Sequence, residues 1–218
     1  MPFRYEEVEI SWLGHAAFLI KFGETLYYID PFKIAPKGPA DVILVTHEHF
    51  DHLSLNDLRK IIKLETEIVA PETCKEQLRM LRSGIIKLIK PGETVEVKNA
   101  KVEAIPAYNV NKFRAPGAVY HPKERGGVGY ILEVGGVRIY HAGDTDFVSE
   151  MKDLKVDIAL VPVSGTFVMT AEEAAEAVNT FKPKVAIPMH FGAIVGGRAD
   201  AEAFKKLAEV DVVILEKE

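Results

Sequence analysis

The sequence predicts a protein of the α/β class (α+β) in which two β-sheets pack face to face and helices cover both outer faces, a four-layer αββα sandwich. Two observations support this fold class. The order of apolar, strand-like segments in the first half of the chain recurs in the second half. In both halves a helix start with a capping-box pattern follows the third of these segments. We expect each half, about 8–110 and 127–218, to supply one sheet and its helices within a single domain of residues 1–218.

The first half is expected to form four strands and a helix. The run Val42–Val45 is apolar throughout, as a buried strand would be. Ser54 and Asp57 mark the start of the helix, because each of these side chains can cap a backbone N–H of the first turn. The expected strands are Trp12–Ile20, Leu26–Asp30, Asp41–Thr46 and Glu67–Pro71.

The second half repeats this series. Thr170 and Glu173 give a second capping-box pattern, and the helix that they begin is expected to reach about Phe181. The expected strands are Gly127–Leu132, Val137–Asp144, Asp157–Pro162 and Lys184–Pro188. A repeat period of about 20 to 50 residues, which would indicate a solenoid, is absent. The pattern therefore predicts one pseudo-duplicated domain.

The composition predicts a soluble globular protein with a substantial core. Hydrophobic residues make up 48% of the 218 residues. No apolar run approaches the roughly 20 residues that cross a bilayer, and residues 1–7 have neither the basic start nor the apolar stretch of a signal peptide. We therefore expect a cytoplasmic protein with no membrane partner.

The charge balance and the single cysteine narrow the classes of function. The 27 Lys and Arg against 32 Asp and Glu give a net charge of −5, so no general field attracts nucleic acid, and a nucleic-acid partner is disfavoured. Cys74 is the only cysteine, which excludes an intramolecular disulfide and a thiolate-rich zinc site. Nitrogen and oxygen atoms must hold any metal that the chain binds.

The most informative residues lie directly after the Val42–Val45 strand. His47, His49, Asp51 and His52 place three imidazoles and a carboxylate within six residues. In extended backbone His47 and His49 point to one face, and Asp51 and His52 follow where the chain turns toward the helix. One metal could bind the first pair and a second metal the next. Imidazole suits zinc, iron or manganese, and a carboxylate among the ligands favours a site that activates water.

The pseudo-repeat predicts that the second half contributes ligands to the same site. Equivalent loops of the two halves should meet at one edge of the sandwich, and these loops contain Asp144, the counterpart of Asp30, and His190. A carboxylate has two oxygens, so Asp144 could bridge two cations. Taken alone, Asp144 could be a turn aspartate after Gly143, and His190 a core histidine.

These residues resemble the metallo-β-lactamase fold hydrolases, whose hallmark is T-H-x-H-x-D-H followed by an aspartate and a last histidine. Thr46–His52 matches the hallmark in full, and the likeness spans nearly the whole chain. The chain is most similar to the small single-domain branch that includes ascorbate-phosphate lactonase-like proteins. The resemblance implies one metal on His47 and His49 and a second on Asp51, His52 and His190, with Asp144 between them.

One ligand that the resemblance implies is missing. Family members usually carry a further histidine for the first metal, where this chain has Asn109, a possible substitute ligand through its neutral carbonyl oxygen. His121, in the long polar loop 109–127, is the best alternative, although it could be an ordinary loop histidine. That loop could also cover the substrate.

The expected function is that of a metal-dependent hydrolase of an ester, lactone or phosphodiester in a small molecule. A metal-activated hydroxide would be the nucleophile, formed on one or two divalent transition-metal ions, with zinc the first choice and manganese, iron or nickel as alternatives. The expected catalytic residues are Asp51 and His121, and His121 or an ordered water would protonate the leaving group.

Further residues are expected around the metals. His15 and Asp30 would orient ligand histidines, although Asp30 could simply cap its turn. Lys123, Arg125 and Arg198 lie in loops that should border the mouth, where they would hold a phosphate or carboxylate of the substrate or else remain solvated.

Three other functions compete with this interpretation. A nuclease of the same superfamily would need a basic track, which is not visible. A di-iron redox protein would resemble the fold but carries Glu where His49 stands. A non-catalytic, metal-stabilised scaffold is favoured only by Asn109. A homo-oligomer is compatible with all of them.

Overall fold

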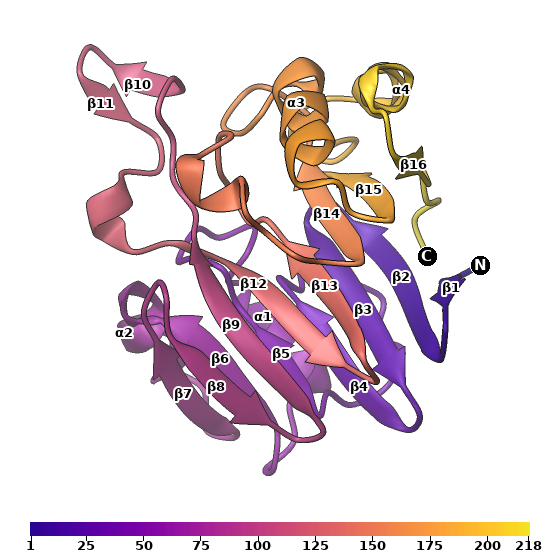
Figure 1. The fold of residues 1–218 in the computed structure, drawn as a ribbon. Helices are drawn as coiled ribbons and strands as arrows, with labels where there is room; N and C mark the ends of the chain where they lie inside the picture. Colours follow the sequence, from indigo (N-terminus) through magenta and orange to yellow (C-terminus); the bar gives the residue numbers. More distant parts are fainter.

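The computed structural model describes residues 1–218 and contains two seven-stranded sheets packed face to face (Figure 1). The strand order in the first sheet is β1-β2-β3-β4-β5-β6-β7, antiparallel from β1 to β4 and parallel from β4 to β7. Its strands are β1 Phe3–Tyr5, β2 Val8–Gly14, β3 Ala17–Phe22, β4 Thr25–Ile29, β5 Val42–Leu44, β6 Glu67–Pro71 and β7 Ile85–Ile89.

The second sheet has the same plan. Its order is β16-β15-β14-β13-β12-β9-β8, with the parallel pairs running from β13 to β16. Its strands are β8 Thr94–Val97, β9 Ala100–Pro106, β12 Val128–Val134, β13 Val137–His141, β14 Ile158–Pro162, β15 Val185–Met189 and β16 Asp211–Val212.

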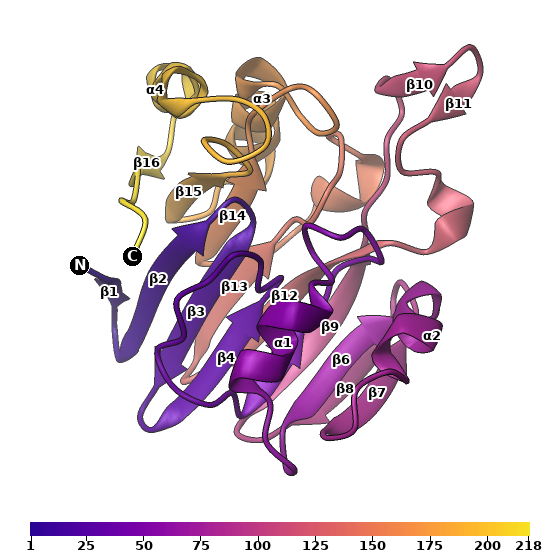
Figure 2. The same ribbon diagram turned by 180° about the vertical axis from the view of Figure 1, so that it is seen from behind.

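Helices cover the outer faces, which confirms the predicted αββα sandwich. The helix α1 lies over the first sheet (Figure 2), while α3 and α4 lie against β14 and β15. Both predicted helix starts are present: the Ser54 side chain accepts from the Asp57 N–H, and Thr170 and Glu173 form a complete capping box. The helices are α1 Leu55–Ile61, α2 Lys75–Leu78, α3 Ala171–Phe181 and α4 Arg198–Leu207, with 3₁₀ turns at Glu72–Cys74, Lys123–Arg125 and Ser149–Met151.

The main core lies between the two sheets, and a smaller core lies beneath α1. Alternation along β4 shows how one strand serves both, because successive side chains point to opposite faces. Tyr27 belongs to the core between the sheets, with Tyr130 of β12, whereas Tyr28 packs in the smaller core with Leu58 of α1. Burial on both faces explains why the parallel strands read as continuous apolar runs.

Two sequence-based boundaries were wrong. The segment Trp12–Ile20 was expected to be one strand, but it turns at His15, whose φ is +55°, and forms the β2–β3 hairpin. The first half was expected to extend to about residue 110, yet β8 and β9 belong to the second sheet, because β9 pairs antiparallel with β12. The chain therefore passes from one sheet to the other between β7 and β8.

The segment between β9 and β12 projects from the sandwich (Figures 1 and 2). It contains a small hairpin, β10 Phe113–Ala115 and β11 Ala118–Val119, and then the 3₁₀ turn at Lys123–Arg125. None of the helices is long and apolar enough to span a membrane.

Candidate metal centre

The candidate site lies at one edge of the sandwich, where strands of both sheets end. Asp30 follows β4, and the segment His47–His52 follows β5. On the second sheet Asp144 follows β13 by a short turn, and His190 follows β15 directly. The carboxyl ends of adjacent parallel strands share one edge, so the topology brings distant parts of the sequence together.

Eight histidine and aspartate side chains form three groups, and within each group the possible ligand atoms lie within 4.8 Å of one another. All six ligands expected from the sequence are among them. We name the first group the buried set and the second the rim set. The groups are His15, Asp51, His52 and His190 (buried set), His47, His49 and His121 (rim set), and His47, His52 and Asp144.

Asp144 lies between the buried set and the rim set. Its Oδ1 is 3.2 Å from His52 Nε2 and 3.3 Å from His190 Nε2. Its Oδ2 is 3.4 Å from His121 Nε2 and 3.9 Å from His47 Nε2. One oxygen thus faces each set, which is the placement that a bridging carboxylate requires.

The turn before Asp144 packs closely against the backbone of β12. Gly143 has φ +65°, and a Cβ there would lie 2.8 Å from the Val128 carbonyl oxygen. A larger residue would therefore push the turn away from β12.

Several buried polar atoms at the centre have no hydrogen-bond partner. They are His52 Nε2, His190 Nε2, Asp144 Oδ1 and His15 Nδ1. A buried polar atom without a partner is costly, and three of these four point at the same place. Imidazole and carboxylate are ligands that transition-metal ions accept, so the residues fit a bound metal.

The outward nitrogens of the ligand imidazoles are held by hydrogen bonds. His52 Nδ1 lies 2.7 Å from Asp30 Oδ2, and His190 Nδ1 lies 3.1 Å from Ser164 Oγ. His47 Nδ1 lies 3.0 Å from Thr46 Oγ1. In each case Nε2 is left to face the centre, the usual arrangement of metal-binding histidines. Asp30 lies where the expected orienting role requires.

At the centre, burial and neighbouring charges shift the pKa values of the side chains in opposite directions. Burial alone would raise the pKa of Asp144, but the imidazoles of His190 and His52 outweigh it and hold that pKa well below 3.8. Burial would lower the pKa of His52, yet the carboxylates of Asp144 and Asp30 raise it well above 6.5. Burial and the neighbouring His52 lower the pKa of His47 well below 6.5.

His15 was expected to orient a ligand histidine, and it lies close enough to the centre to belong to the buried set. Its Nε2 is 2.9 Å from Asp51 Oδ2, as expected for a residue that orients Asp51. Its ring centroid is also only 4.0 Å from that of His190. The left-handed backbone of His15 and the bond from the His190 N–H to its carbonyl fix this position.

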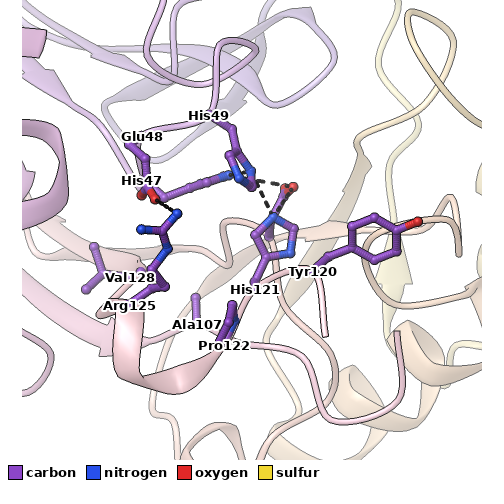
Figure 3. Close-up of a pocket in the computed structure, with 11 residues that line it drawn as sticks. His47, Glu48, His49, Ala107, Tyr120, His121, Pro122, Arg125 and Val128 are labelled. Carbon is purple, nitrogen blue, oxygen red and sulfur yellow. Dashed lines mark hydrogen bonds and ion pairs between the residues drawn. The ribbon is translucent and has the colours of Figure 1, made fainter. Parts of the chain in front are cut away.

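In the rim set three ring nitrogens converge. His49 Nδ1 is 3.1 Å from both His47 Nε2 and His121 Nε2 (Figure 3). His49 and His121 are half-buried, so this set is the more accessible one. The placement of His121 favours the ligand role over that of a proton donor, because its Nε2 faces the other two imidazoles.

Asn109 was expected as a possible substitute ligand, but its side-chain oxygen is engaged by His121. Its Oδ1 accepts from the His121 backbone N–H and faces His121 Nδ1 at 2.8 Å, so it points at a ring rather than at the centre.

A cavity that is open to solvent lies above the rim set, with about 350 Å³ of empty space including its mouth. Arg125 lines it and lies 3.3 Å from the Glu48 carboxylate (Figure 3). The remaining lining residues are His47, His49, Ala107, Tyr120, His121, Pro122, Gly127, Val128 and Asp144.

Two of the three cations expected at the mouth do not line this cavity. Lys123 is held by Glu150 at 2.7 Å and lies over the Tyr108 ring. Arg198 pairs with Glu202 and Glu216 on α4 and the chain end. Of the three expected cations, only Arg125 therefore lies at the mouth.

Three residues that support the site were not predicted. Thr46 and Ser164 contact the outward nitrogens of His47 and His190. Asp146 accepts a hydrogen bond from Asn109 Nδ2. Thr46 was noted only as part of the motif. Asp146 follows the Asp144 turn closely enough to have been considered, whereas no local pattern distinguishes Ser164 from other loop serines.

Comparisons with known proteins agree with this geometry. The family model described as beta-lactamase superfamily domain matches residues 9–190. A UPF0173 metal-dependent hydrolase of Thermococcus onnurineus is 36% identical over 227 residues, covering 95% of this chain and 96% of the relative.

Solved structures show the same fold. One from Parabacteroides distasonis is 33% identical and superposes with a TM-score of 0.84, covering 100% of this chain and 98% of that one. Igni18, a metallo hydrolase of Ignicoccus hospitalis, is 23% identical with a TM-score of 0.77 over 96% of this chain and 95% of its own, a likeness of fold alone. The chain therefore belongs to the UPF0173 metal-dependent hydrolases of the beta-lactamase superfamily, and this superfamily is the one that its hallmark residues predicted.

Proposed function

We propose that the protein hydrolyses an ester, lactone or phosphodiester bond of a small molecule at this centre. The observation that carries the proposal is the position of Asp144, which presents one oxygen to the buried set and one to the rim set at the floor of the cavity. Such an arrangement fits two cations that share a carboxylate.

His47, His49 and His121 would hold one ion, and Asp51, His52 and His190 the other, with Asp144 between them. When bound, such ions, zinc being the first choice for these ligands, lower the pKa of a water toward neutrality and polarise a carbonyl or phosphoryl oxygen. Asp51 would act as a ligand whose other interaction is with His15.

The residues that line the cavity indicate the charge of the substrate. Arg125 is the only Lys or Arg that lines it, and the guanidinium is shaped to bind a carboxylate or phosphate. Arg125 would exchange Glu48 for an anionic group of the substrate, while the ring of Tyr120 and Pro122 contact its apolar part.

The test is a screen of zinc- and manganese-loaded protein against phosphodiesters, lactones, thioesters and a short oligonucleotide. We expect turnover of at least one small substrate and its loss in Asp144→Asn, with Arg198→Ala as the surface control. Turnover of the oligonucleotide alone would instead favour the nuclease. Full metal binding without any turnover would favour a scaffold.

A further inference from the structure

Asn109 and His121 are joined by three contacts. The Asn109 Oδ1 accepts from the His121 backbone N–H at 2.9 Å and lies 2.8 Å from His121 Nδ1. In return the Asn109 N–H donates to the His121 carbonyl at 2.8 Å. Asn109 is only 4% exposed, so water does not compete for these bonds.

The orientation of the Asn109 amide follows from its other neighbours. Its Nδ2 donates to Asp146 Oδ1 and to the Phe167 carbonyl, both at 3.0 Å. Both partners are acceptors, so the NH₂ group must face them and the oxygen must face His121.

Asp146 is held in place by backbone N–H groups of the loop that follows Asn109. Its Oδ2 accepts from the Val110 N–H at 2.6 Å and the Asn111 N–H at 2.9 Å, and it is 1% exposed. This buried carboxylate therefore sets the position of Asn109, which in turn sets that of His121.

The same chain of contacts decides where the His121 proton lies. An amide oxygen only accepts, so Nδ1 must carry the proton, and a neutral imidazole then has its lone pair on Nε2. That Nε2 lies 3.1 Å from His49 Nδ1 (Figure 3). It also lies 3.4 Å from Asp144 Oδ2.

The backbone beyond His121 is also anchored. Lys123 binds Glu150 at 2.7 Å and lies over the Tyr108 ring, and the Tyr108 hydroxyl donates to the same carboxylate at 3.0 Å. The loop that carries His121 is thus tied on both sides, although it lies outside the two sheets.

We propose that Asn109 and Asp146 are positioning residues that make His121, a loop residue, the third ligand of the rim set. They fix both its rotamer and its Nδ1–H tautomer before any metal binds. The inference rests on the proposed function in that it concerns the same centre.

The first test uses metal-free protein and needs no substrate. Long-range ¹H–¹⁵N NMR spectra report the tautomer of each imidazole, and His121→Gln identifies the His121 signals. We expect the Nδ1–H tautomer in the wild type and in Asn111→Ala, a matched control whose side chain bonds Glu173 instead. Asn109→Ala should show a mixture of tautomers. An unchanged Nδ1–H tautomer in Asn109→Ala would overturn the proposal.

The second test measures metal binding by calorimetric zinc titration. Asn109→Ala should weaken one class of site by about 10- to 100-fold and leave the other unchanged, as loss of an orienting partner does. Equal affinities in Asn109→Ala and the wild type would contradict the proposal.

A pair of substitutions covers the case in which Asn109→Ala fails to fold. Asn109→Asp places a carboxylate against Asp146 and should weaken the same site. Adding Asp146→Asn restores a donor opposite an acceptor and should recover most of the affinity and the Nδ1–H tautomer, although the Phe167 carbonyl stays unpaired. No recovery would overturn the inference. A correct tautomer without any hydrolysis would count only against the proposed function.

Discussion

Asp30 Oδ2 lies 2.7 Å from His52 Nδ1, and neither side chain is exposed to solvent. The same carboxylate accepts from the Thr46 N–H at 2.8 Å and from Thr46 Oγ1 at 2.6 Å. Asp30 therefore ties the end of β4 to the loop after β5, and it holds the proton of His52 on the side away from the centre. The Asp30 side chain therefore both connects two strand ends and orients the His52 ring.

Replacing Asp30 with Ala should damage both stability and metal binding. Three donors would lose their buried acceptor, so we expect a loss of about 3 kcal/mol or more in the free energy of unfolding, measured by urea denaturation. Zinc affinity of the buried set should fall by about 10- to 100-fold in a calorimetric titration.

The matched control is Asp157→Ala, which removes a carboxylate from the opposite end of β14. It should leave zinc binding unchanged. Wild-type zinc affinity in Asp30→Ala would show that His52 is oriented without Asp30.

Arg125 should affect substrate binding rather than the chemical step. For an anionic substrate, Arg125→Ala is expected to raise KM about tenfold with little change in kcat, which corresponds to about 1.4 kcal/mol of lost binding. Arg198→Ala should change neither constant, because Arg198 pairs with Glu202 and Glu216. Steady-state kinetics with an anionic substrate and with its neutral ester measure this, because only the anionic substrate should show the rise in KM. A fall in kcat alone in Arg125→Ala would contradict the assignment.

The sequence predicted the sandwich because its signals are local. Runs such as Val42–Val45 and capping boxes such as Thr170–Glu173 specify elements without knowledge of the rest of the chain. The hairpin turn at His15 was missed although Gly14, with φ +103°, marks it, because a single glycine within an apolar run, without Pro, Asn or Asp beside it, is a weak turn signal. β9 was assigned to the wrong half because pairing partners are decided by packing.

The six ligands expected from the sequence converge as expected, since motif spacing and strand ends are both readable from residue order. The supporting contacts could not be read in this way. Asn109 and His121 are separated by a projecting hairpin, so only the fold shows that the amide holds the imidazole. The partners that keep Lys123 and Arg198 away from the cavity are likewise distant in sequence.

Glu150 should make stability depend on acidity. Burial opposes ionisation, but the hydrogen bonds from Lys123, the Glu150 backbone, Ser149 and Tyr108 together outweigh it and lower the pKa of Glu150 from 4.5 to about 2. The ionised carboxylate therefore stabilises the fold fully above pH 4.5, and this contribution is lost as pH falls toward 2. Since a quarter of the side chain is exposed (25%), we expect Glu150→Gln to cost only about 1 kcal/mol at pH 6.

Urea unfolding of metal-free wild type and Glu150→Gln from pH 6 to pH 2 tests this. The difference between them should shrink as pH falls below 4.5. A constant difference over the whole range would mean that the Glu150 charge contributes nothing and that only its shape matters.

Removing metal should lower the melting temperature, because His52 Nε2, His190 Nε2 and Asp144 Oδ1 are buried without other partners. A ligand present at 100 times its Kd stabilises the folded state by about 2.7 kcal/mol. For a chain of this length that amounts to roughly 5 to 11 °C. Calorimetric scans of chelator-treated protein, with and without added zinc, measure the shift. Asp144→Ala removes the carboxylate that both sets share, so zinc should raise its melting temperature much less. An equal shift in Asp144→Ala would mean that the stabilising ion binds elsewhere.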